Sequence, residues 1–456
     1  MNEKNDLTTG NVGRRLLVFA LPYLLSSFMQ TFYGMADLFV VGLYRGSATS
    51  SAVAIGSQVT HMLTVVIVGL AMGSTVRIAR YTGAKDETGT GKTVGNSILL
   101  FAGFALILTI LLCFFTENIT ALMRTPQEAV EETGRYLIIC FSGIPFIVAY
   151  NVICSIFRGI GDSRSPMYFV AVACVINIVL DFVFVGGMGL GAEGAALGTI
   201  LGQAFSVLSA GLVIWRRDLG FSLDRQCFVP DQKVMGQILK VGTPIACQDG
   251  LIQVAFLIIT VIANSRGLTD ATAVGIVEKI IGFLFLVPSA FLSAISAITA
   301  QNMGASKPER ARECLRIGLM ITIGWGLLCA VYNQFLPQTL VGLFTRDSMV
   351  LQAGCGYLRS YSLDCVFAAV HFCFSGYFCG NQQAMISFVH NMLSMVLIRV
   401  PGAYLASIRF PQTLYPMGLA APLGSLLSAA ICIGFFLYDR KKAIYKNCES
   451  SYNKNI

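Results

Sequence analysis

Long apolar runs, separated by short segments that hold charge, glycine or proline, fill almost the whole chain. A helix needs about 20 apolar residues to cross the hydrocarbon core of a bilayer. Twelve runs have the length for this, and they cover residues 16–43, 52–78, 94–116, 135–156, 165–187, 193–215, 236–263, 273–299, 314–336, 355–378, 384–407 and 415–438. The pattern predicts an all-α polytopic membrane protein with twelve transmembrane helices.

The composition supports this prediction, because 55% of the 456 residues are hydrophobic and only 12% are charged. Soluble globular domains have about 25% charged residues. The first apolar run is too long for a signal-peptide core and lacks an Ala-x-Ala cleavage site, so it is expected to stay as the first span. The 14 cysteines include no Cys-x-x-Cys pair and mostly stand singly in apolar runs, which indicates reduced packing residues.

Basic residues concentrate in every second loop. One set of loops, with both ends of the chain, holds Lys4, Arg14, Arg15, Arg80, Lys85, Lys92, Arg158, Arg164, Arg216, Arg217, Arg225, Lys233, Lys240, Lys307, Arg310, Arg312, Arg440, Lys441, Lys442 and Lys446. The alternate loops hold little more than Arg45, Arg124, Arg266, Arg346 and Arg409. Since cytoplasmic loops have the excess of Lys and Arg, both termini of this cell-membrane protein are expected in the cytoplasm. This topology accounts for the net charge of +8 without a nucleic-acid partner.

The two halves of the chain share landmarks at a nearly constant offset. The pairs are Ala79 with Ala300, Pro22 with Pro244, Gly161 with Gly380 and Gly194 with Gly418, at offsets of 221, 222, 219 and 224 residues. Six spans per half predict two parallel six-helix repeats, which bind substrate near the midplane and rock against each other. The expected parts are an N-lobe at 1–215, a cytoplasmic linker at 216–240, a C-lobe at 241–438 and a basic cytoplasmic tail at 439–456.

Two carboxylates lie within the apolar runs. Asp181 follows Asn177 by four residues in the fifth run, so the two share one face of a helix, and Asp37 lies towards the end of the first run. An ionised side chain in the middle of a bilayer costs roughly 2.5–3.5 kcal/mol or more, so it faces a partner or a water-filled cavity. The two acids are therefore predicted to form the cation-coupling site of a secondary transporter.

The motifs around these acids resemble those of the multidrug and toxic-compound extrusion (MATE) family. The matching segments are Phe157-Arg158-Gly159-Ile160-Gly161-Asp162-Ser163, the Asn177 to Asp181 spacing, Pro22 with Met35-Ala36-Asp37-Leu38-Phe39-Val40-Val41-Gly42, and Gly194-Ala195-Ala196-Leu197-Gly198-Thr199. The resemblance covers nearly the whole chain. It implies a V-shaped, two-lobe exporter of amphipathic, cationic drugs or toxic organic compounds, driven by Na⁺ or H⁺ antiport.

The resemblance also implies a site. Carried over to this chain, the family's N-lobe cation site consists of Asp37, Asn177, Asp181 and Thr199, with Pro22 as a hinge in the first span. Two carboxylates, an amide carbonyl and a hydroxyl suit Na⁺, a hard cation that prefers oxygen ligands. Proton coupling suits the same set, because two close carboxylates in a medium of low dielectric constant favour holding a proton. The structural alternative is that both acids only bond neighbouring helices.

The C-terminal half departs from the family pattern, in which acids on the seventh and tenth spans bind a cation. The polar residues that form a possible C-lobe cavity are Gln248, Asp249, Gln253, Glu278, Asp364 and His371. Glu278 and its neighbour Lys279 are either a neutralising pair or groups that act on a substrate or a proton. Arg399 is expected to pair with an acid or reach the interface, and His371 to hydrogen-bond between helices.

Other functional classes lack their motifs. The chain has no His-Glu-x-x-His or Gly-x-Ser-x-Gly, and Gly91-Lys92-Thr93 is no phosphate-binding loop because Asp86 stands in place of its first glycine. The protein is therefore not expected to be an enzyme, and it needs no cofactor besides the coupling ion. A flippase of lipid-linked sugars or cell-wall precursors in the same superfamily is the alternative. The expected partners are a small organic substrate and the bilayer, with the chain as a monomer.

Overall fold

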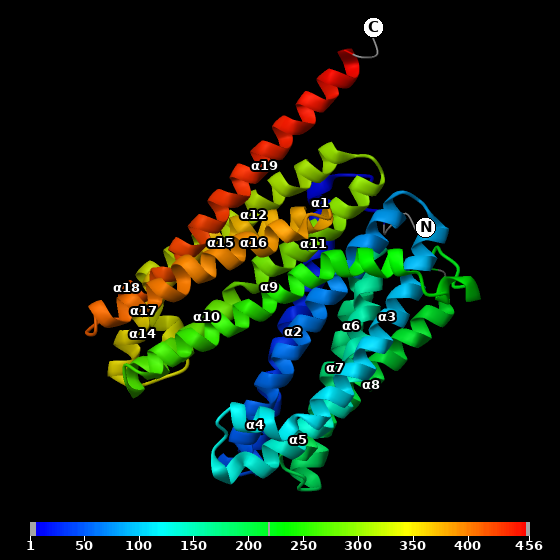
Figure 1. Cartoon of the computed structure of the whole chain (residues 1–456). Coiled ribbons are helices and arrows are strands. Elements are labelled where there is room, and N and C mark those ends of the chain that lie inside the picture. The colour runs from blue at the N-terminus through cyan, green and yellow to red at the C-terminus, as the bar shows by residue number, and fades with distance from the viewer. Residues whose placement is uncertain (1–5, 218, 453–456) are drawn as a thin grey trace. The chain divides into compact units, whose positions relative to one another are not determined.

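The computed structural model describes residues 6–217 and 219–452, with side chains as far as Lys442, and every regular element in these ranges is helical (Figure 1). Lys4 lies outside the described residues. Ten of the described helices are long and apolar enough to cross a membrane, and two bent helix pairs raise the number to as many as twelve. The bent pairs, Gln127–Ser142 with Ile144–Gly159 and Ser348–Tyr361 with Asp364–Gly380, coincide with the predicted fourth and tenth spans. The predicted all-helical membrane fold is confirmed.

The helices of the first repeat, in chain order, are α1 (Val12–Tyr44), α2 (Ser47–Gly83), α3 (Glu87–Phe114), α4 (Thr116–Leu122), η2 (Gln127–Ala129), α5 (Val130–Ser142), α6 (Ile144–Gly159), α7 (Arg164–Asp181), η3 (Phe182–Gly187) and α8 (Ala192–Arg216). α1 runs through Pro22 without a break. The bend between α5 and α6 measures 48° and falls at Gly143, inside an apolar run. The hydrophobic pattern did not predict this bend.

The remaining helices are η4 (Arg225–Phe228), α9 (Gln232–Asn264), α10 (Leu268–Leu284), α11 (Leu286–Gly304), α12 (Pro308–Phe335), α13 (Pro337–Val341), α14 (Ser348–Tyr361), α15 (Asp364–Gly380), α16 (Ala384–Ser394), η5 (Met395–Arg399), α17 (Val400–Arg409), α18 (Tyr415–Gly418) and α19 (Ala420–Tyr452). α19 continues into the predicted tail, because lysine, arginine and alanine at its end are good helix formers. Residues 453–456 of that tail lie outside the described residues.

The turn Gly159-Ile160-Gly161-Asp162-Ser163 starts α7. Gly161 has φ +90°, a conformation that favours glycine. The Asp162 carboxylate accepts hydrogen bonds from the backbone N–H groups of Arg164 and Ser165, at 3.0 and 3.1 Å. It also accepts one from Arg217, at 2.8 Å, just after the end of α8. The motif therefore has a structural role, since it caps α7 and ties that helix to α8.

Two segments have π-helical geometry. They are η3, which directly follows Asp181, and η5, which ends at Arg399. η3 ends the fifth span of the first repeat, Arg164–Gly187, and η5 lies within that of the second repeat, Ala384–Arg409. π-Helical turns are rare and often lie at functional sites. Both adjoin a buried ionisable side chain, so they mark equivalent places in the two repeats.

Contacts group the chain into two compact units. The first contains the chain up to Gly250 with Ser293–Cys314 and Gly380–Gln382, and the second contains Leu251–Leu292, Leu315–Cys379 and the chain from Gln383 on. Each unit has an apolar core, with Tyr136 and Phe157 buried in the first and Tyr357 and Ile281 in the second. These units are defined by contacts between residues, whereas the predicted lobes were defined by the repeat in the sequence. The two divisions differ, because helices such as α9, α11 and α12 have residues in both units.

The segment between the repeats binds along α3. The Asn96 amide nitrogen donates to the carbonyl oxygens of Cys227 and Val229, at 3.3 and 3.2 Å, and the Asn96 carbonyl accepts from the N–H of Asp231, at 2.7 Å. Lys92 adds an ion pair to Asp231 at 2.6 Å. A side chain at Gly95 would collide with the backbone of Cys227. The predicted linker at 216–240 therefore has two parts. The first part docks on α3, and the second part, from Gln232, is already helical and belongs to α9.

Replacing Asn96 with alanine is expected to release this segment from α3. The change removes three hydrogen bonds, each of which contributes about 0.5–1.5 kcal/mol, so local opening should become about tenfold or more frequent. The measurement is the rate at which a maleimide modifies Cys227, which is 9% exposed, followed by peptide mass spectrometry. Gly103→Ala is the control, because its new methyl group in the same helix would contact nothing within 4 Å. Equal rates in both variants would contradict the docking interaction.

Candidate functional site

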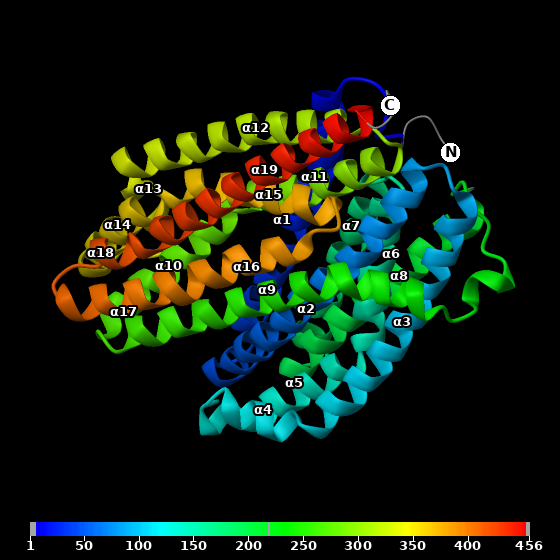
Figure 2. The same cartoon turned by 45° about the horizontal axis from the view of Figure 1, so that its top comes forward.

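The four residues of the predicted N-lobe cation site lie together on α1, α7 and α8. Asp37 on α1 is 3% exposed, Asn177 and Asp181 on α7 are 2% and 0% exposed, and Thr199 on α8 is partly buried. α7 and α8 run side by side in both views (Figure 1 and Figure 2). All four belong to the first compact unit, so their arrangement does not depend on the second.

A chain of hydrogen bonds connects three of these side chains. The Asn177 amide nitrogen lies 3.4 Å from the Thr199 hydroxyl oxygen, and that hydroxyl donates to Oδ2 of Asp37 at 3.2 Å. The Asp37 and Asp181 carboxyl groups lie within hydrogen-bonding reach of one another when one of them holds a proton. No Lys or Arg among the described residues forms an ion pair with either acid.

Four buried oxygen atoms of this cluster have no hydrogen-bond partner among the described residues. They are Oδ1 of Asp37, Oδ1 of Asn177 and both carboxylate oxygens of Asp181. Leaving a buried acceptor unsatisfied costs about 1–3 kcal/mol, and more when it is charged. Carboxylate and amide oxygens are ligands that a hard cation accepts, and a carboxylate also binds a proton. The donor set therefore suits either ion.

Glycines of α8 let its backbone approach this cluster. A side chain at Gly198 would collide with Oδ1 of Asp181, and one at Gly202 would lie 2.9 Å from the carbonyl oxygen of Ala173. Gly194, one turn earlier, faces Phe184. The repeated glycine spacing predicted close helix packing, but only the structure places Gly198 against the acid. Gly198 is thus the residue of the site that sequence reasoning missed.

The possible C-lobe residues are arranged differently. Asp364 is fully buried and accepts a hydrogen bond from Nη2 of Arg399 at 2.9 Å, and the same nitrogen donates to the Tyr361 hydroxyl at 2.9 Å. The expected pairing of Arg399 with an acid is thus present. Removing one partner of a buried ion pair costs about 3–5 kcal/mol, because the other charge stays uncompensated. Asp364 therefore differs from Asp37 and Asp181, since its charge is matched within the protein.

Glu278 and Lys279 do not neutralise each other. Oε2 of Glu278 accepts a long hydrogen bond from Thr260 at 3.5 Å, and no ion pair involves Lys279 among the described residues. Consecutive residues point about 100° apart on a helix, which accounts for the separation. Glu278 is partly buried and Lys279 is exposed.

The other C-lobe residues form separate groups. The His371 ring centre lies 5.7 Å from that of His390, whose Nε2 is 3.0 Å from the Ser375 hydroxyl oxygen, so these histidines join α15 to α16. The Gln248 amide nitrogen lies 3.4 Å from Oδ1 of Asp249, and both residues belong to the first unit. Gln253 belongs to the second unit, as do Glu278, Asp364 and His371. Of the six residues predicted for a C-lobe cavity, Glu278, Asp364 and His371 lie near Arg399 within the second unit, and a cavity formed by all six stays a prediction.

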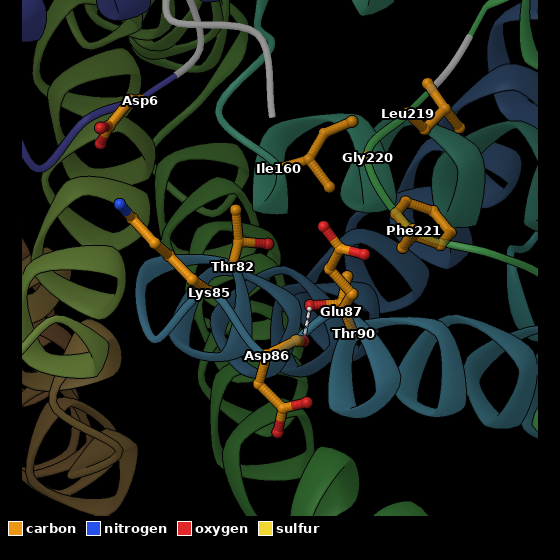
Figure 3. A pocket seen from close by; sticks show the side chains of 10 residues that line it. All are labelled: Asp6, Thr82, Lys85, Asp86, Glu87, Thr90, Ile160, Leu219, Gly220 and Phe221. Atoms are coloured by element: carbon orange, nitrogen blue, oxygen red, sulfur yellow. Dashed lines mark hydrogen bonds between the residues drawn. The ribbon is translucent and has the colours of Figure 1, made fainter.

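A cavity of about 360 Å³ lies apart from these groups, at the turn between α2 and α3 (Figure 3). Its lining includes Asp6, Lys85, Asp86 and Glu87. Asp86 caps α3 by accepting a hydrogen bond from the Gly89 N–H at 2.8 Å. None of the residues predicted for cation binding lines this cavity, so its charged groups are attributed to solvated loop ends.

Replacing Gly198 with alanine should displace the Asp181 carboxylate with little loss of stability. The new methyl group collides with the end of a side chain that can rotate, so the free energy of unfolding is expected to fall by about 1 kcal/mol or less. Rotation separates Asp181 from Asp37, and the rise of the melting temperature with Na⁺ or with falling pH should shrink. Gly211→Ala on the same helix meets nothing within 4 Å and is the control. Identical ion responses in the two variants would contradict the role of Gly198.

Comparisons with known proteins agree with this arrangement. The family model MatE matches residues 22–183 and 244–405. The probable multidrug resistance protein YpnP of Bacillus subtilis is 27% identical, over 96% of this chain and 98% of its own length. The FAD transporter of Shewanella oneidensis is 24% identical, over 96% and 97%. The solved structure of a MOP superfamily transporter from Pyrococcus furiosus matches with a TM-score of 0.90 at 21% identity, over 97% of this chain and 98% of the other, which shows the same fold.

The two matched ranges have equal length and cover most of both repeats, so the family is shown by the chain as a whole and not by one motif. Members of this family are ion-coupled antiporters. The chain belongs to the MatE family of multidrug and toxic-compound extrusion proteins, and it is a multi-pass membrane transporter, not an enzyme.

Proposed function

We propose that the protein is a secondary active exporter that exchanges Na⁺ or H⁺ for amphipathic, chiefly cationic organic compounds by alternating access. The observation that carries this proposal is the buried Asp181 carboxylate, which lies beside Asp37 and has no hydrogen-bond donor among the described residues. An intramembrane acid in this state favours binding a cation or a proton, because its charge is otherwise poorly solvated. The relatives named as multidrug proteins in Bacillus subtilis and Staphylococcus aureus support a drug-like substrate.

The proposed coupling step neutralises the two acids. A cation or proton that enters from outside binds Asp37 and Asp181, while Asn177 and Thr199 offer a carbonyl and a hydroxyl oxygen. Removing the repulsion between the carboxylates changes how α1 packs on α7, which reshapes the N-lobe cavity and expels the substrate. The ion then leaves to the cytoplasm, and the repulsion returns. Each transport cycle therefore requires the site to be loaded and emptied once.

The proposed movement in α1 uses Pro22. Proline has no N–H to donate to the preceding turn, so the helix bends there more easily than elsewhere. The Ser26 hydroxyl donates to the Pro22 carbonyl at 2.8 Å, and such a bond to the preceding turn competes with the helical bond to the same oxygen and favours bending. In this scheme the predicted lobes, 1–215 and 241–438, rock around the substrate. Glu278, which lacks an ion pair among the described residues, is the acid proposed for the C-lobe part of the path.

We also propose the orientation and setting of the protein. The excess of Lys and Arg in alternate loops supports cytoplasmic termini in the cell membrane, with the linker and the tail on the same side. The working unit is proposed to be a monomer. A flavin dinucleotide is a second candidate substrate, because the FAD transporter of Shewanella oneidensis matches almost the whole chain. A flippase of lipid-linked precursors has less support, since Arg399 pairs with Asp364 instead of lining an open phosphate site.

The proposal predicts that Asp181→Asn abolishes ion-driven export. The amide keeps the size of the side chain but neither binds a cation strongly nor exchanges a proton, so the gradient-driven rate should fall at least about tenfold, or about 1.4 kcal/mol. The measurement is efflux of a fluorescent cationic dye from cells, with the Na⁺ and H⁺ gradients collapsed in turn. Glu128→Gln makes the same chemical change at an exposed position and should export like wild type.

The possible outcomes separate the alternatives. Loss of export in wild type when one gradient is collapsed identifies the coupling ion. If Asp181→Asn reaches the membrane normally and exports as well as wild type, the carboxylate only joins helices and the coupling proposal is wrong. Inhibition of dye uptake into inside-out vesicles by added FAD would favour the flavin dinucleotide over cationic drugs as the substrate.

A further inference from the structure

Most membrane-spanning helices of this protein expose large apolar side chains, as expected for contact with lipid. Examples are Phe32 on α1, Ile110 on α3 and Leu328 on α12, which are 55%, 63% and 62% exposed. Two helices differ. The exposed residues of α2 are Ser47, Ala54, Gln58 and His61, and those of α10 are Leu268, Thr272, Lys279 and Gly282. Apart from Leu268 at the end of its helix, none of these is a large apolar residue.

The exposed faces of α2 and α10 occupy equivalent positions in the two repeats. Ala79 and Ala300, which end the same two spans, are 221 residues apart, and the same offset relates Gln58 to Lys279. It also relates Ala54 to Gly275 and His61 to Gly282. Gln58 with Lys279 and His61 with Gly282 are exposed in both repeats, whereas Gly275 is only partly exposed. Because these positions are equivalent in the two repeats, we expect the two faces to have the same environment.

Water is the environment that suits these faces. Glutamine, histidine and lysine within a span are costly against lipid, and they normally line a water-filled cavity or the interior of a bundle. These residues are exposed, so they do not face a bundle interior. A methyl group added at Gly275 or Gly282 would contact nothing within 4 Å, which leaves open space on both sides of Lys279 along α10. We take each face, within its own unit, to border water and not lipid.

Lys279 is the charged residue of these two faces. It lies inside the candidate span Leu268–Gly304, and no ion pair or hydrogen bond of its side chain occurs among the described residues. Its neighbour Glu278 turns towards Thr260 instead. The equivalent residue in the first repeat, Gln58, is neutral. The face of α10 therefore presents to water a positive charge that has no ion pair among the described residues, which the exposed residues of α2 do not.

We propose that Lys279 is a substrate-recognition residue that receives an anionic group, a carboxylate or a phosphate, of the transported molecule. Its ammonium group offers three hydrogen-bond donors and a charge of the required sign. This inference rests on the proposed export function and narrows its substrates, among amphipathic cations, to zwitterionic ones that have an anionic group as well. The open space beside Gly275 and Gly282 gives the anionic group room to approach α10.

The test compares two dyes with the same chromophore, a rhodamine with a free benzoate and its methyl ester. Their binding to purified protein in phosphatidylcholine nanodiscs is measured by fluorescence anisotropy without any ion gradient. Wild type should bind the free benzoate more tightly than the ester. Lys279→Gln, which introduces the residue found at position 58, should weaken binding of the benzoate about tenfold and change that of the ester less than about twofold. Lys279→Arg keeps the charge and should retain the preference.

Three results would overturn this role of Lys279. They are equal binding of both dyes by wild type, equal weakening of both dyes in Lys279→Gln, and no binding of either dye by wild type. A matching melting temperature for the Gln and Arg variants shows that any difference between them is due to charge and not to misfolding. Because no gradient is applied, a failure of ion coupling at Asp181 leaves the ratio of the two affinities unchanged, so the two proposals fail separately.

Discussion

The close approach of α8 to α7 is the constraint on which the candidate ion site depends. Lipid offers no hydrophobic drive between helices, so small residues that allow tight packing hold such a pair together. Gly198 and Gly202 have this role here, and Thr199, between them, extends to Asp37 on α1. The residues that join the helices therefore also remove water from the Asp181 carboxylate.

The two repeats use one framework for opposite charge arrangements. In the first, two acids lie together and no basic residue among the described ones pairs with them. In the second, Arg399 neutralises Asp364 and also contacts Tyr361, so this buried pair is balanced. A balanced pair is a fixed part of the interior, because separating it is costly. An unbalanced pair changes its affinity with its surroundings, which is what a site that must load and release an ion requires.

The spans were predictable because an apolar run of about 20 residues is typical of a transmembrane helix and rare in soluble domains. The acids were predictable because charge within such a run is rare.

Other features could not be predicted from the sequence, because they depend on how segments that are far apart in the chain pack together. Gly198 faces Asp181 only because of how α8 packs on α7, and Arg399 finds Asp364 across 35 residues of sequence. The bend at Gly143 lies within an unbroken apolar run. The helix ends extend beyond the predicted runs, because helical hydrogen bonding continues after the hydrocarbon region ends.

The π-helical turn after Asp181 has an evolutionary consequence. Such a turn accommodates one residue more than the α-helix around it, so deletion of a single residue between Phe182 and Gly187 would restore regular geometry. The residues between the deletion and Gly187 would then rotate by about 100° relative to Asp181. A deletion in the turn that ends at Arg399 would rotate the whole of α17, which follows in the same span, relative to α16. Paralogues could therefore exchange the residues around an intramembrane charge through insertions and deletions of one codon, without any substitution at the charge itself.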